Sequence, residues 1–182
     1  MNQQSARDAV RRAASHLRSR GIRVPRFRLT TEWDWKTPIG GSFVILDGRV
    51  RQLNMGRYPT EFLRRWFAMH ELGHLLWAAH HPLRRKRFRS AFGEPLPPDY
   101  DSIHGREAWK TTLALNLNLS LRPGPHRPEG EPSWYGARAG GEERFCELLG
   151  LMWAHGDFSD PPPDDLEDLW DCCWTHGLSH MT

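Results

Sequence analysis

The chain has 182 residues, of which 38% are hydrophobic and 11% aromatic, and this is enough for one compact domain with a sizeable buried core. With 25 basic and 22 acidic residues, the formal net charge is only +3, which favours acidic partners mildly. Because the charge is scattered along the chain, nucleic-acid binding is unlikely. Arginines interrupt residues 1–21 where a secretory signal has an apolar core, and no apolar run is long enough to span a membrane. We therefore expect a cytoplasmic protein without a membrane anchor, although export without such a signal stays open.

The first elements in chain order are a helix and a small sheet. Residues 1–22 predict a basic helix that ends at Gly21 and carries only a narrow apolar stripe. Residues 23–58 predict a small antiparallel sheet, in which GSFVILDGRVRQLNM forms a hairpin because Asp47-Gly48 suits a tight turn. An exposed edge of such a sheet can hold an extended peptide.

The next element, residues 59–81, predicts a long and largely apolar helix that contains the run His70-Glu71-Leu72-Gly73-His74. At 3.6 residues per turn, the two histidines lie one turn apart on the same face, with Glu71 at the edge of that face. Two imidazoles in this arrangement can bind one zinc ion, and the carboxylate can reach the metal's water without ligating the metal. This is the HExxH signature of zinc peptidases. The alternative is a hydrogen-bonded pair of core histidines.

A catalytic zinc site needs a third protein ligand. One branch of zinc peptidases uses a histidine six residues after the second, here His80, but needs a glycine where this chain has Trp77. If the helix continues, His80 points about 80° away from His70, and His81 returns to that face roughly 16 Å further along the axis. Neither histidine is expected to complete the site.

Residues 142–154 predict a helix that offers a better third ligand. Glu143, Cys146, Glu147 and Gly150 fall along one stripe of this helix, and two carboxylates on a half-buried helix have little purpose as packing alone. Glu143 would complete the set of two histidines and one glutamate that is typical of catalytic zinc. Glu147, one turn later, could orient one of the ligands.

The pairing of HELGH with the downstream SWYGARAGGEERFCELLGLM resembles the gluzincin peptidases, most closely the catalytic domain of the anthrax lethal factor type. The resemblance implies that His70, His74 and Glu143 bind zinc and that Glu71 is the general base. It also implies that Tyr135 donates a hydrogen bond in the transition state. The likeness covers the motif helix and the later segment, and the hairpin more loosely.

This sequence departs from that family at several points. The spacing from Tyr135 to Glu143 is one residue longer than the family's, which leaves Glu142 as an alternative ligand, and Glu147 is a further alternative. Arg144 and Cys146 stand where the family has an aromatic and a small residue. A weaker resemblance links the same two segments to the ImmA/IrrE-type zinc peptidases, which cleave phage-type repressors.

The predicted fold is a single α+β, zincin-like domain over residues 1–182. It places a small antiparallel sheet on a central HExxH helix, followed by a helical part that ends in a helix over residues 164–177. The predicted function is a zinc-dependent endopeptidase acting on a protein or peptide. One alternative is an inert zinc-stabilised binding or regulatory module with a fourth protein ligand. The other, less favoured, is a nucleic-acid-associated protein that uses the basic helix and residues 84–89, RRKRFR.

Overall fold

The computed structural model describes residues 3–30, 41–46, 50–55, 58, 60–79, 127–139 and 141–178. Over these residues the protein is mostly helical with one small sheet, an α+β arrangement. The elements are α1 (Gln3–Ser19), β1 (Arg28–Thr30), β2 (Gly41–Leu46), β3 (Val50–Met55), α2 (Glu61–Ala79), α5 (Trp134–Ala139) and α6 (Gly141–Gly156). Three short pieces, η2 (Asp164–Leu166), α7 (Glu167–Cys172) and η3 (Cys173–Leu178), follow them. No helix in the described part of the chain is both long and apolar enough to cross a membrane.

The sheet has the strand order β1-β3-β2 and is mixed. Strands β2 and β3 pair antiparallel, with Leu46 opposite Val50, and this confirms the predicted hairpin. Strand β1 instead pairs parallel with β3, with Leu29 opposite Leu53, so the prediction of a wholly antiparallel sheet is wrong. The error has a physical reason. Local alternation of side chains predicts a strand, but the direction in which a strand joins its neighbour depends on the path of the chain between them.

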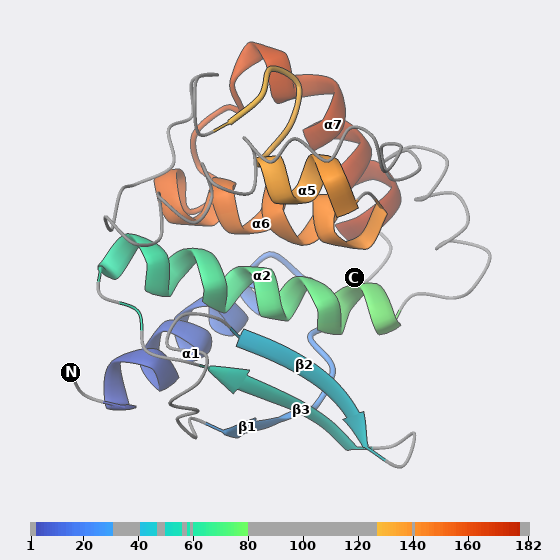
Figure 1. Ribbon diagram of the computed structural model, residues 1–182. Helices are drawn as coiled ribbons and strands as arrows, with labels where there is room; N and C mark the ends of the chain where they lie inside the picture. The colour runs from blue at the N-terminus through green and yellow to red at the C-terminus, as the bar shows by residue number, and fades with distance from the viewer. Residues whose placement is uncertain are drawn as a thin grey trace.

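Helix α2 occupies the centre of the molecule. Figure 1 shows it running between the sheet and α1 on one side and α5 and α6 on the other. The hydroxyl of Thr60 accepts a hydrogen bond from the backbone N–H of Leu63 at 3.1 Å and so caps the start of the helix. Just before it, the Tyr58 ring stacks on Phe67 at 4.6 Å between centroids and fixes how the chain enters α2. The HELGH run therefore lies inside the protein, not on its surface.

Two glycines allow α2 and α6 to approach closely. A Cβ atom added to Gly73 of α2 would lie 3.0 Å from Sγ and 3.1 Å from Cα of Cys146 on α6. A Cβ atom added to Gly150 of α6 would lie 2.9 Å from the Trp66 indole on α2. At these two points nothing larger than hydrogen fits between the helices. This close contact places the first turns of α6 within side-chain reach of the histidines on α2.

The C-terminal part differs from the single helix predicted over residues 164–177. The chain there runs through a 3₁₀ turn, a short α-helix and a π-helical turn in succession. Its start is pinned by Arg127, whose buried guanidinium donates two 2.9 Å hydrogen bonds to the Asp165 carboxylate. The backbone N–H of Gly130 donates a third at 2.8 Å. These bonds fix the 3₁₀ turn against the segment that leads into α5.

Candidate metal centre

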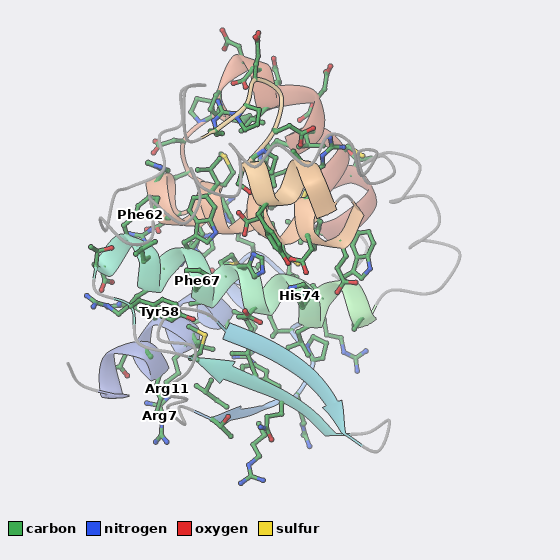
Figure 2. The ribbon with its side chains drawn as sticks, in the orientation of Figure 1. Arg7, Arg11, Tyr58, Phe62, Phe67 and His74 are labelled. Atoms are coloured by element: carbon green, nitrogen blue, oxygen red, sulfur yellow. The ribbon has the colours of Figure 1, made fainter. Side chains whose placement is uncertain are left out.

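The structure brings together the three side chains that the sequence predicts as metal ligands. His70 and His74 lie one turn apart on α2, and Glu143 reaches them from the first turn of α6, so that one ligand atom of each lies within 4.8 Å of the others. The two Nε2 atoms are 3.2 Å apart. Each of them is 3.5 Å from Oε2 of Glu143. Figure 2 shows the position of His74 along α2.

The other ring nitrogen of each histidine is paired with a different glutamate of α6. Nδ1 of His70 lies 2.8 Å from Oε1 of Glu147, and Nδ1 of His74 lies 2.8 Å from Oε1 of Glu142. An ionised carboxylate only accepts hydrogen bonds, so Nδ1 of His74 is the nitrogen that donates its proton to Glu142. Nδ1 of His70 lies at ion-pair distance from Glu147 without the geometry of a hydrogen bond. In both rings it is Nε2 that faces the other histidine and Glu143.

Three possible ligand atoms therefore converge on one point. The Nε2 atoms of His70 and His74 are hydrogen-bonded to each other at 3.2 Å, and both lie 3.5 Å from Oε2 of Glu143. Oε2 of Glu143 is buried and has no hydrogen-bond partner among the described residues. Acceptors packed this closely repel one another unless a cation lies between them. A proton on one ring satisfies part of the cluster, whereas a single metal ion satisfies all three atoms.

Glu143 carries the charge that a metal ligand needs. Burial raises its pKa, but the close approach and charge of His74, the charge of His70 and a hydrogen bond from Tyr135 lower it by more, so the net pKa is below its usual value. The Glu143 carboxylate is therefore ionised at neutral pH.

Tyr135, on α5, reaches the same carboxylate. Its hydroxyl is hydrogen-bonded to Glu143, and burial, together with the charges of Glu143 and Glu147, raises its pKa to about 12. The phenol therefore keeps its proton and remains a hydrogen-bond donor across the physiological pH range. Helix α5 is held close to α6, since a Cβ atom on Gly136 would lie only 3.2 Å from Cα of Arg144. The segment that contains Tyr135 therefore lies beside the cluster of His70, His74 and Glu143.

Glu71 is buried beside the cluster but is not part of it. Its side chain is only 3% exposed, and its Oε2 atom has no hydrogen-bond partner within the described part of the chain. Burial raises its pKa, and the charges of His70 and His74 oppose this only in part. An unpartnered buried carboxylate with a raised pKa is typical of a group that accepts a proton during catalysis.

The structure also separates the three glutamates that the sequence leaves as alternative ligands. Glu143 points at both Nε2 atoms, whereas Glu142 and Glu147 each hold one Nδ1 atom. The pairing of Glu142 with His74 is missed by the sequence argument. The only signal for it is the Glu142-Glu143 pair in the first turn of α6, where acidic residues are common because they offset the helix dipole.

Cys146 lies next to the cluster without joining it. Burial raises the pKa of its thiol to about 12, so the thiol is neutral, and its sulfur is not among the three grouped ligand atoms. His80, His81 and the RRKRFR run lie outside the described residues. Comparison of the chain with models of known protein families, with curated proteins and with solved structures finds no match.

Proposed function

We propose that the protein is a zinc-dependent metallopeptidase with a zincin-like arrangement, in which His70, His74 and Glu143 hold the metal. The single observation that carries the proposal is the triangle of possible ligand atoms formed by these three side chains, with sides of 3.2, 3.5 and 3.5 Å. Hydrogen bonding within the described residues leaves its Glu143 corner unpaired.

The triangle fits a zinc ion. Zinc binds nitrogen and carboxylate oxygen at about 2.0–2.2 Å with tetrahedral geometry, which places neighbouring ligand atoms about 3.3–3.6 Å apart. The two separations of 3.5 Å lie within this range, and the 3.2 Å between the two Nε2 atoms lies just below it. Three protein ligands leave a fourth position for water or substrate, as in catalytic sites, whereas an inert structural site has four protein ligands.

Each neighbouring side chain then has a role in peptide hydrolysis. Bound zinc supplies a Lewis acid that polarises the scissile carbonyl and lowers the pKa of water. Glu71 takes the proton of the attacking water and passes it to the departing amine, and its unpartnered Oε2 atom is free to do so. Tyr135 keeps its hydroxyl proton and donates a hydrogen bond to the developing oxyanion.

A protein or peptide substrate suits the surroundings of the cluster. Strand β2 lies at one edge of the sheet and contacts α2, and no described strand pairs with its outer side. An extended peptide that adds to this edge would run beside the HELGH helix. Backbone hydrogen bonds of this kind hold a peptide with little dependence on its sequence.

The substitution Glu71→Gln tests the proposal. The variant should keep one zinc ion per chain and lose cleavage of a peptide library, because glutamine cannot accept the proton. Glu61→Gln is the matched control, since Glu61 begins the same helix and is half exposed; it should keep both zinc and activity. Loss of zinc in Glu71→Gln would make Glu71 a ligand. Zinc without cleavage in the wild-type protein would support the inert module instead.

A further inference from the structure

A second feature of the molecule lies away from the histidine cluster, between α1 and β1. It is a cavity of about 380 Å³ whose wall residues are Arg7, Val10, Arg11, Ala14, Arg18, Phe27 and Leu29. None of them belongs to α2 or α6. Figure 2 shows Arg7 and Arg11 extending from α1 on the side away from α2. The volume lies within the range of about 300–1,000 Å³ that small-molecule sites occupy.

Three arginines line this cavity from one face of α1. Arg7, Arg11 and Arg18 fall within about 40° of one another at 100° per residue, and all three are exposed. Arg11 contacts Asp8 at 3.5 Å, a pair in which both side chains are largely exposed. Arg7 and Arg18 have no hydrogen bond or ion pair with any described residue. Arg7 and Arg11 lie one turn apart, and the repulsion between their charges destabilises α1. The other side chains on this face of the helix do not compensate for it.

The rest of the wall is apolar. Val10 and Ala14 are buried at the base of the arginines, and Phe27 and Leu29 are half-buried on the facing segment. A fully hydrated inorganic anion makes no use of such a wall, and a neutral apolar molecule makes no use of the arginines. A molecule that carries both an anionic headgroup and an apolar part is complementary to both halves of the cavity.

We propose that this cavity binds a soluble amphiphilic anion, with a carboxylate, sulfonate or phosphate headgroup on an apolar chain or ring. The guanidinium groups of Arg7 and Arg11, which lie one turn apart on α1, hold the headgroup through charge-assisted hydrogen bonds, for which the planar guanidinium is well suited, and Arg18 adds positive charge further along the same face. The apolar part lies against Phe27 and Leu29, the two apolar side chains of the wall that are partly exposed. This proposal is independent of the metal centre and holds whether or not the protein is a peptidase.

The test uses the fluorescent sulfonate 8-anilinonaphthalene-1-sulfonate with the full-length protein. The wild type should bind one equivalent, and Arg7→Gln/Arg11→Gln should weaken binding about tenfold or more, since two charge-assisted contacts are lost. The matched control is Arg23→Gln/Arg26→Gln, which removes the same charge from two exposed arginines that do not line the cavity. Its affinity should equal that of the wild type. Equal weakening in both double variants would overturn the proposal.

Competition experiments test the same cavity in the wild-type protein, without any substitution that could disturb folding. Decanoate should displace the dye at a concentration at least about tenfold lower than either decanol or acetate, because only decanoate has both the charge and the chain. If decanol displaced the dye as effectively as decanoate, the cavity would bind ligands through its apolar wall alone, without a contribution from the arginines. Binding to vesicles containing phosphatidylserine without displacement by decanoate would make the arginine face a membrane contact. Either result would overturn the proposal.

Discussion

His70 and Glu147 form a buried pair across the interface between α2 and α6, with Nδ1 2.8 Å from Oε1. The two side chains are only 7% and 1% exposed. The orientation of the imidazole is therefore set by the protein core and does not depend on solvent. The equivalent pair of His74 with Glu142 has the same length, but the Glu142 side chain is 42% exposed. The two histidines of the cluster are thus held with unequal rigidity.

This difference predicts unequal effects on metal affinity. Glu147→Ala should weaken zinc binding about 10- to 100-fold, as expected when the carboxylate behind a ligating histidine is removed. Glu142→Ala should weaken it less, because water can replace a half-exposed carboxylate. Competition with a chelator of known affinity measures both constants. A larger loss in Glu142→Ala than in Glu147→Ala would show that Glu142, and not Glu143, is the third ligand.

Zinc binding should be coupled to the release of a proton. Burial lowers the pKa of His74, but its hydrogen bonds with Cys146 and Glu142 and its close approach to Glu143 raise it by more, so the net pKa in the metal-free protein is above its usual value. A metal needs the neutral ring, and the proton on His74 must leave when zinc binds. Because that proton is held more weakly as the pH rises, zinc affinity should increase with pH by up to about tenfold per unit near neutrality.

Calorimetry in two buffers with different ionisation enthalpies counts the protons released. The expected value at pH 7 is about one to two protons per zinc ion, because burial lowers the pKa of His70 but Glu147 and Glu71 raise it by more. A histidine pair that is already neutral in the metal-free protein would release none, and zinc affinity would then be flat across the neutral range.

The contact between Gly73 and Cys146 predicts an unusual cost for a small substitution. Alanine is the better helix former, yet in Gly73→Ala the new Cβ would lie 3.1 Å from Cα of Cys146, a backbone atom that cannot move independently of α6. We expect a loss of about 1–3 kcal/mol in the free energy of unfolding. Thermal unfolding followed by circular dichroism measures it, with Ala78→Gly as a control for helix propensity on the same helix. Stability equal to or above that of the wild type would mean that the helices can separate without cost.

Tyr135 is expected to act on turnover more than on metal binding. Tyr135→Phe should reduce kcat about 10²- to 10³-fold, because a donor to the developing oxyanion is lost, and should leave zinc bound even though the hydrogen bond to Glu143 is lost as well. Since the pKa of Tyr135 is raised to about 12, its ionisation should not lower wild-type activity below pH 10. Steady-state kinetics of the two proteins across this pH range tests both statements. Retention of full kcat in Tyr135→Phe would remove Tyr135 from the mechanism.

The parts of the fold that the sequence predicts are those with a local signal. The predicted helices over residues 59–81 and 142–154 correspond to α2 (Glu61–Ala79) and α6 (Gly141–Gly156), since both carry a long apolar period. The hairpin is predicted by the Asp47-Gly48 pair, which suits a tight turn. No local pattern predicts that β1 pairs parallel with β3, because strand direction depends on the path of the chain between the two strands.

The candidate site divides in the same way. His70 and His74 are brought together by spacing on one helix, and this can be predicted from five residues. Their meeting with Glu143 depends on the close packing of α2 on α6, for which Gly73 is the relevant but easily missed residue. Which of three nearby glutamates faces Nε2 is a matter of side-chain direction at a helix end, and residue spacing alone does not determine it.

The metal content of the purified protein tests the central claim most directly. Elemental analysis of the wild type should find one zinc ion per chain, lost in Glu143→Ala and retained in His80→Ala, with circular dichroism confirming that both variants fold. Loss in His80→Ala and retention in Glu143→Ala would move the third ligand to His80. An absence of zinc from every sample, even after refolding with the metal, would contradict the account and return His70 and His74 to a buried hydrogen-bonded pair.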